Sequence, residues 1–211
     1  MPASDVLAEL REQVMYGGIT PGSRINIDAV ARDLGVSATP VRDALNRLEA
    51  DRLVVYTQGR GYTSAPLLDL AGLRALYEYR LLIEPWAARR VATDILVNPA
   101  GDLRRELAQA GELLSGERTA KLDIVMHDVR FHETLIRATG NPFVVDAYTQ
   151  THCHVHTYRL YGDRVSPRAT LAEHTAVVDA VAAQDGDGAA EAMTAHITNS
   201  FRRFASTLSE R

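Results

Sequence analysis

Apolar residues recur at helical spacing in the first part of the chain, and glycine and proline residues divide them into short segments. Three helices are predicted, over residues 5–16, from about 26 to 34 and from about 38 to 49. An apolar strand at 53–56, a glycine-flanked turn and a returning strand from Tyr62 follow. This order of elements predicts a winged helix-turn-helix over residues 1–66.

The remainder of the chain, residues 67–211, is helical in pattern and contains no convincing alternating strand. Proline and glycine residues, among them Gly116 and Gly162, separate its periodic stretches. Helices are predicted near residues 69–92, 99–115, 117–139, 142–161, 167–184 and 187–208. The fold class is therefore mostly α, with an N-terminal winged helix-turn-helix joined through residues 66–69 to a C-terminal all-α helical bundle.

The composition of the chain indicates the cellular compartment in which the protein is expected. The chain has no apolar run of about 18 residues, the length that a membrane-spanning helix needs. Its N-terminus lacks the basic and then apolar pattern of a signal peptide. The single cysteine, Cys153, cannot form an internal disulfide, which fits a reducing compartment. We therefore expect a cytoplasmic protein with no membrane partner.

Net charge gives DNA binding no support. The whole chain carries a formal charge of −4, and residues 1–66 contain seven arginines, no lysine and eight acidic residues. Any affinity for DNA must therefore come from the positions of particular arginines, and non-specific binding is expected to be weak.

The exposed polar positions at the start of the second helix of the helix-turn-helix are the candidates for DNA contact, because this end of the helix meets the base edges. They are Ser37, Thr39, Arg42 and Asn46. Arg42 suits a paired hydrogen bond to guanine, and the hydroxyls suit phosphate. Arg60, at the hairpin tip, suits the minor groove. The alternative is that Arg42 and Arg47 form the solvated side of an amphipathic helix.

The segments Ile19–Ile25, Leu34–Leu45 and Arg47–Glu49, followed by the glycine-tipped hairpin, closely resemble the GntR family of bacterial regulators. The resemblance covers about residues 5–65. It implies a winged helix and DNA contacts at Thr39, Arg42 and the wing glycine Gly61. Ala38 stands where many relatives carry arginine, which changes the expected operator contacts.

Histidines lie only in the second half of the chain. Three of them and one aspartate are predicted at about the same height along neighbouring helices. Asp128 and His132 are one turn apart on one predicted helix. His174 and His196 flank the turn at Gly186 at nearly equal distances, so they stand at about the same height of an antiparallel helix pair. One carboxylate and three imidazoles suit a divalent metal ion. Each histidine taken singly is more often an ordinary core or surface residue.

A second resemblance bears on this set. The segment from Asp128 to Leu135, followed by Gly140-Asn141-Pro142, is similar to the signature of the FCD ligand-binding domain, the partner of the winged helix in the FadR-like branch of the GntR family. It implies that Asp128, His132, His174 and His196 bind a metal, as in the shorter six-helix form of the domain. Zinc is the expected ion, with nickel, manganese or iron as alternatives.

The same resemblance implies that Arg80 faces the ligand pocket. A divalent ion with one carboxylate ligand keeps a positive charge, and an adjacent guanidinium adds another, so the site favours a small organic acid. The alternative is that Arg80 pairs with Glu84 one turn away. On a helix, His152 and His156 share a face and His154 points away. His152 and His156 are therefore the candidates for lining the effector pocket.

The preferred function is a ligand-responsive transcriptional regulator and not an enzyme. We expect a homodimer on a near-palindromic DNA operator, modulated by a small carboxylate effector. A metal-dependent hydrolase is the main alternative, since His152, His154 and His156 would share one face of a strand. Such barrels need about 250 residues and alternating strands, which the helical second half does not offer. A third alternative keeps the DNA-binding half and makes the metal purely structural.

Overall fold

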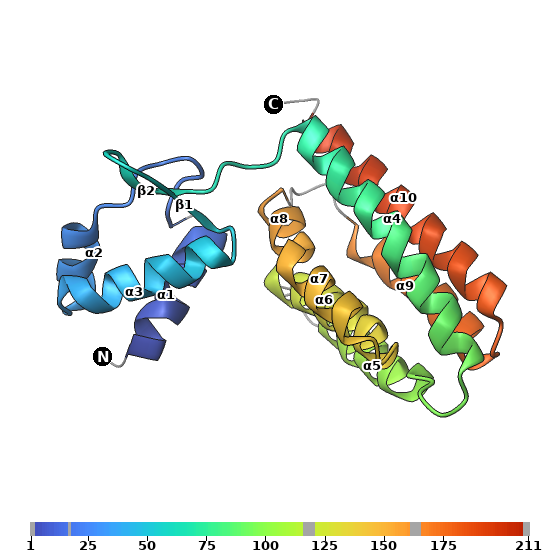
Figure 1. Cartoon of the computed structure of the whole chain (residues 1–211). Helices are drawn as coiled ribbons and strands as arrows, with labels where there is room; N and C mark the ends of the chain where they lie inside the picture. Colours follow the sequence, from blue (N-terminus) through green and yellow to red (C-terminus); the bar gives the residue numbers. More distant parts are fainter. Residues whose placement is uncertain (1–2, 17, 116–120, 161–165, 209–211) are drawn as a thin grey trace. The chain divides into compact units, whose positions relative to one another are not determined.

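The computed structural model describes residues 3–16, 18–115, 121–160 and 166–208. The chain forms two compact units (Figure 1), of which the first ends at Leu68 and the second begins at Asp69. Among the described residues of both units, no helix is long enough and apolar enough to cross a membrane. Each unit is described by itself below.

The first unit has three helices and a hairpin. They are α1 (Ala3–Tyr16), α2 (Ile27–Leu34), α3 (Ala38–Ala50), β1 (Val54–Thr57) and β2 (Gly61–Ser64). Asn26 caps α2, because its side-chain oxygen accepts hydrogen bonds from the N–H groups of Asp28 and Ala29. Gly35 ends α2 in the left-handed conformation, with φ +65°. The change of direction between α2 and α3 therefore follows from Gly35, whereas Asn26 fixes where α2 begins.

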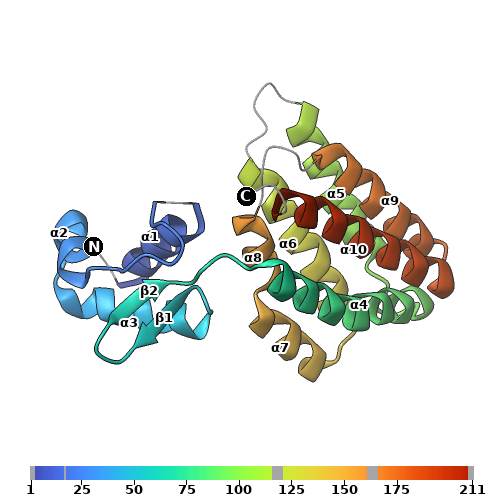
Figure 2. The same ribbon diagram turned by 90° about the horizontal axis from the view of Figure 1, so that it is seen from above.

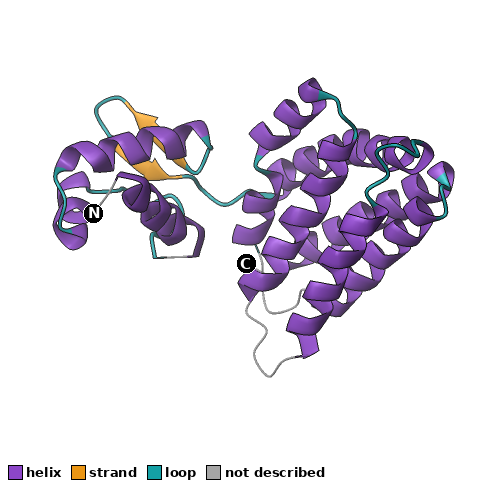
Figure 3. Ribbon diagram, turned by 90° about the horizontal axis from the view of Figure 1, so that it is seen from below, coloured by secondary structure: helices purple, strands orange, loops and turns teal. Residues whose placement is uncertain are grey.

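The core of this unit lies between α1, α3 and the hairpin. The face of α3 that the spacing predicts to be apolar is buried, and it packs on a matching face of α1. The buried residues are Val41, Ala44, Leu45 and Leu48 of α3, with Val6, Leu10 and Val14 of α1. The strands β1 and β2 pair antiparallel (Figure 3), and Gly61 begins β2 with φ +82°. This arrangement confirms the predicted winged helix-turn-helix.

The second unit is entirely helical in its described residues. Its helices are α4 (Leu70–Thr93), α5 (Ala100–Ser115), α6 (Lys121–Ala138), α7 (Pro142–Thr151), α8 (Cys153–Arg159), α9 (Pro167–Ala182) and α10 (Gly186–Leu208). The long helices α4 and α10 lie side by side (Figure 2), and α9 packs against α10 and α5. A side chain at Gly186 would approach Thr93 Cγ2 to 2.7 Å, so glycine permits the close contact between the start of α10 and the end of α4.

The prediction of one helix over 142–161 is wrong. His152 adopts φ +46°, its N–H donates to the carbonyl of Thr149, and the chain restarts as α8. Neither glycine nor proline marks this break, which is why the spacing did not reveal it. The predicted breaks at Gly116 and Gly162, and the predicted start of the helix over 117–139, lie outside the described residues.

Candidate metal centre and DNA-reading surface

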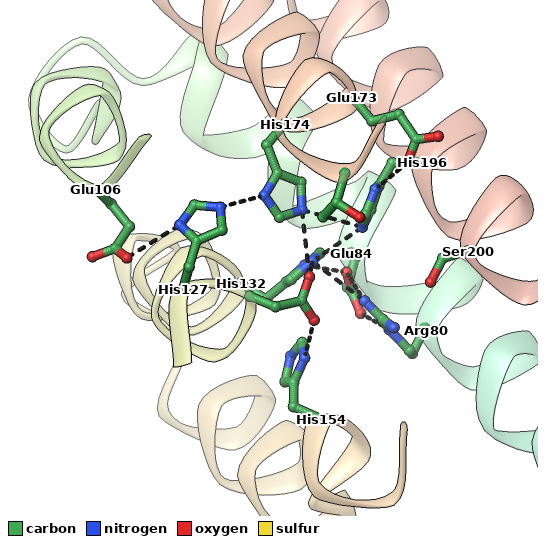
Figure 4. A network of polar contacts seen from close by, with 12 residues as sticks. Arg80, Glu84, Glu106, His127, His132, His154, Glu173, His174, His196 and Ser200 are labelled. Carbon is green, nitrogen blue, oxygen red and sulfur yellow. Dashed lines mark hydrogen bonds and ion pairs between the residues drawn. The ribbon is translucent and has the colours of Figure 1, made fainter. Parts of the chain in front are cut away.

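Four side chains from three helices meet inside the second unit (Figure 4). Asp128 and His132 come from α6, His174 from α9 and His196 from α10, and one ligand atom from each lies within 4.8 Å of all the others. The Nε2 atom of His196 is 3.2 Å from Nε2 of His132 and 3.3 Å from Nε2 of His174. Oδ1 of Asp128 is 3.6 Å from Nε2 of both His132 and His174. The structure therefore brings together the residues that helix spacing predicts at one level.

The opposite nitrogen of each histidine faces a hydrogen-bond acceptor. Nδ1 of His132 lies 2.7 Å from Oε2 of Glu84, and Nδ1 of His196 lies 2.9 Å from Oε2 of Glu173. A carboxylate only accepts hydrogen bonds, so the proton of a neutral His196 ring lies on Nδ1, and the ion-pair contact with Glu84 favours a proton on Nδ1 of His132 as well. The lone pair of Nε2 then points into the centre, as in histidines that bind metals.

His174 is held by a relay of two residues. Nδ1 of His127 lies 3.1 Å from Glu106 Oε1, and its Nε2 lies 2.9 Å from Nδ1 of His174. Because Glu106 accepts from Nδ1, the neutral His127 ring offers Nε2 as an acceptor to His174. Arg130 also donates to Glu106. His127 is fully buried, and sequence spacing gave no reason to single it out.

His154 joins the centre from α8, which the sequence interpretation did not predict. Its Nδ1 donates to Asp128 Oδ2 at 2.8 Å, and its Nε2 lies 3.0 Å from the hydroxyl of Tyr148. The break at His152 turns α8 away from the line of α7, so the face expected from an unbroken helix does not apply. His152 instead lines a neighbouring hollow, and His156 is half-buried on α8.

Arg80 is buried beside the centre and bound to Glu84, which is the alternative that the one-turn spacing left open. Its Nε lies 2.6 Å from Glu84 Oε1, and Nη2 lies 3.4 Å from Nε2 of His132. Tyr148 also donates to Glu84 Oε1 at 2.9 Å. Glu84 thus links α4 to a histidine of the centre.

Burial and neighbouring charges set the protonation of the centre. Burial, with the nearby imidazoles, holds the pKa of His174 well below its usual value, and burial also lowers the pKa of His196. Burial opposes charge on His132 too, but the carboxylates of Glu84 and Asp128 outweigh it and raise that pKa. For Asp128, burial is outweighed by His132 and His154, and its pKa is well below normal. The centre therefore combines an ionised carboxylate with two neutral imidazoles and a third that a cation would deprotonate.

The DNA-reading candidates lie on the exposed side of α3 and on the hairpin. Thr39, Arg42 and Asn46 are exposed on α3, and Arg60 is exposed at the hairpin tip. Ser37 is the N-cap residue of α3, but its side chain makes no capping hydrogen bond. A surface hollow connects this side of α3 to the wing, and Arg24, Arg42, Tyr56, Gly61 and Tyr62 are among the residues that line it.

Tyr62 is a further residue of this surface, and the sequence interpretation used it only to mark a strand. Its hydroxyl donates to Asn46 Oδ1 at 2.5 Å, and its ring packs on that of Tyr56 with centroids 4.9 Å apart. The wing is thus tied directly to the middle of α3, and the Asn46 side chain is held in one orientation.

Comparison with known proteins finds a matching family model for each of the two units. Residues 2–63 match the model of bacterial regulatory proteins of the gntR family, and residues 75–199 match that of the FCD domain. The chain belongs to the GntR family of regulators, in the branch with an FCD domain. The family consists of transcriptional regulators and not of enzymes, so the hydrolase alternative is excluded.

Curated relatives of this GntR regulator span nearly its whole length. The galactonate operon transcriptional repressor of Escherichia coli is 28% identical and covers 94% of each chain. The Nta operon transcriptional regulator of Aminobacter aminovorans is 30% identical, covering 86% of this chain and 84% of its own. A crystal structure of a putative GntR regulator from Rhodococcus sp. RHA1 has a TM-score of 0.77 at 20% identity over 97% of both chains, which supports the fold.

Proposed function

We propose that this regulator binds a near-palindromic DNA operator as a homodimer and that a small organic acid, bound at a divalent metal ion in the second unit, modulates that binding. The observation that carries the proposal is the convergence of Asp128, His132, His174 and His196, whose ligand atoms lie within 4.8 Å of one another. The helix-turn-helix supplies the DNA-binding half of the same chain.

The donor set fits a metal ion. Acceptors near the Nδ1 atoms leave the Nε2 lone pairs of the neutral rings facing inward, and a divalent cation would displace the proton that the raised pKa of His132 favours. Ligands arranged tetrahedrally around zinc at about 2.0–2.1 Å lie about 3.3–3.4 Å apart. Four of the six separations in the centre are 3.2 to 3.6 Å, and the other two are within 4.8 Å, so one divalent ion can reach all four donors. Zinc suits three nitrogens and one oxygen best, with nickel, manganese and iron as alternatives.

An anionic effector fits the surroundings of this ion. When bound, a divalent metal with one carboxylate ligand supplies an excess positive charge that holds an anion. The cleft beside the centre is also lined by His154, Thr157, Thr170, Ser200 and Arg203, of which Arg203 pairs with Glu173. Hydroxyls and a guanidinium are donors suited to a carboxylate that bears hydroxyl groups. The relative named for the galactonate operon supports a sugar acid or similar compound.

Arg80 is proposed to contribute to the effector response through its positive charge near the centre. Its guanidinium lies 3.4 Å from His132, although Glu84 neutralises much of that charge. Helix α4 carries both residues and follows the joint between the units, so we propose that effector binding shifts α4 and thereby alters DNA binding. An Arg80→Ala protein that releases DNA at an unchanged effector concentration would dismiss this role. Direct effector contacts from His152 and His156 remain predictions.

The DNA contacts belong to the same proposal. Arg42 and Asn46 would read base edges in the major groove, and Ser37 and Thr39 would bind phosphate. Arg60, with the close backbone approach that Gly61 permits, would enter the minor groove. A symmetric dimer would place two such surfaces on the two half-sites of the operator.

The test measures how the affinity for operator DNA depends on the metal and on the effector. Operator DNA is selected from a random pool with purified protein, and its affinity is measured by fluorescence anisotropy while small organic acids are titrated into zinc-loaded and chelated protein. We expect one acid to change DNA affinity only in the zinc-loaded protein. Thr170→Val should weaken the response about fivefold through loss of one hydrogen bond. Thr175→Val, on the exposed side of α9, is the matched control.

A purely structural metal is the second candidate, and the burial of the donors favours it. His132, His174 and His196 are at most 1% exposed. In that case chelation would lower stability, and the effector would still change DNA affinity after the metal is removed from protein that stays folded. No response to any acid in the zinc-loaded protein would refute the effector itself.

A further inference from the structure

Helix α4 exposes apolar side chains beside α10. Leu82 is 75% exposed and Trp86 is 41% exposed. Between the two helices, which lie side by side in Figures 1 and 2, a surface hollow is lined by Pro85, Trp86, Arg89 and the α10 residues Ala190, Glu191, Thr194 and Ala195. Large exposed apolar side chains next to a surface hollow are typical of a protein–protein interface.

We infer that a second copy of this chain covers this face, through antiparallel pairing of α4 with α4 of the partner about a two-fold axis. The inference rests on the proposed homodimer and names its surface, which the operator symmetry alone does not identify. The argument comes from the order of residues along α4.

The charges and the apolar residues of α4 are arranged symmetrically. At about 100° per residue, Glu78, Leu82, Pro85 and Arg89 fall within about 60° of one another around the helix. Along the helix, Glu78 and Arg89 are equally far from the midpoint between residues 83 and 84, and so are Leu82 and Pro85. A two-fold axis through that midpoint therefore brings the Glu78 position of each copy opposite the Arg89 position of the other.

The same two-fold arrangement also places a side chain of the partner in the hollow between α4 and α10. Leu82 of each copy meets Pro85 of the other, next to Trp86, so the most exposed apolar side chain of α4 enters the hollow beside α10. Arg89 already bonds Asp187 at 2.7 Å, but both side chains are more than half exposed, so this surface pair is available to an additional acidic neighbour.

The area is sufficient for a dimer. Helix α4 has 24 residues, which at about 1.5 Å each gives a length of about 36 Å, and two adjacent helices are about 20 Å wide. The face therefore measures roughly 700 Å² per copy, close to the value of about 800 Å² per partner in standard interfaces.

Analytical ultracentrifugation of the full-length protein tests the inference. We expect a wild-type dimer, and we expect Leu82→Glu to raise the dimer dissociation constant by at least about 100-fold, because two large apolar contacts are lost per dimer. Leu96→Glu is the matched control, since Leu96 is 94% exposed in the α4–α5 connection. Circular dichroism and zinc binding verify that each variant is folded.

A charge exchange tests the antiparallel register. Glu78→Arg and Arg89→Glu should each weaken the dimer, and the double variant should recover at least tenfold of that loss because the pairs form again in the opposite sense. A Leu82→Glu protein that dimerises like wild type would overturn this surface while leaving the proposed dimer and effector standing. A failed recovery would overturn the antiparallel pairing, and a monomeric wild type would overturn the surface and the proposed dimer together.

Discussion

His127 offers a direct test of how the candidate metal centre is built. Its Nε2 lies 2.9 Å from Nδ1 of His174, and its Nδ1 lies 3.1 Å from Glu106. His127→Phe keeps an aromatic ring in this buried position, beside Phe131, but removes both nitrogens. The N–H of His174 then loses its acceptor inside the core, and the ring of this ligand is no longer held in one tautomer and orientation.

The expected loss follows from two independent magnitudes. Removing the partner of a ligating histidine typically costs about 10- to 100-fold in metal affinity, which corresponds to about 1.4–2.7 kcal/mol. A buried donor without a partner costs about 1–3 kcal/mol. The two ranges agree, so we expect the zinc dissociation constant of His127→Phe to rise by about 10- to 100-fold.

Competition with a chromophoric chelator measures this dissociation constant. Arg130→Ala is the control, because it removes another partner of Glu106 without touching His174, and we expect less than about a threefold change. Circular dichroism of both metal-free variants should match the wild type. If folded His127→Phe binds zinc as tightly as wild type, the buried relay does not orient His174 and the reasoning about its tautomer fails.

Three further results are expected. Chelation of protein held at a zinc concentration about 100 times its dissociation constant should lower the free energy of unfolding by about 2.7 kcal/mol, and an unchanged urea midpoint would contradict a metal bound in the folded core. Tyr62→Phe should reduce the ratio of specific to non-specific DNA binding about fivefold, because the hydrogen bond to Asn46 is lost. Competition with random DNA measures this ratio, and an unaltered ratio would mean that Tyr62 does not contribute to sequence recognition. Arg42→Ala should cost about 1–3 kcal/mol of operator affinity, whereas Arg104→Ala, the same charge change in the second unit, should leave anisotropy titrations nearly unchanged; equal losses would mean that only net charge matters.

Periodicity predicted those parts of the fold whose causes are local. The buried face of α3 follows from the spacing of apolar residues, and the end of α2 follows from Gly35, which tolerates the left-handed conformation. Nearly equal distances from the Gly186 turn were enough to bring His174 and His196 together, because two antiparallel helices have the same rise per residue.

The partners of the metal-site residues required the tertiary arrangement. Glu84 reaches His132 only because α4 packs on α6, and Glu106 reaches His127 only because α5 packs on α6. No spacing within one helix encodes either contact. The family resemblance implied the four candidate ligands but gave no information about the acceptors behind them.

The left-handed residue between α7 and α8 has a consequence for how such regulators are sorted. In an uninterrupted helix, Tyr148 and His154 would point about 120° apart and lie about 9 Å from each other along the axis, yet their polar atoms are 3.0 Å apart. The left-handed conformation of His152 thus adds one helix to the count and brings the imidazole of His154 to Asp128. The number of helices is therefore a poor criterion for dividing these domains into metal-dependent and metal-independent types, and the side chains facing the centre are a better one.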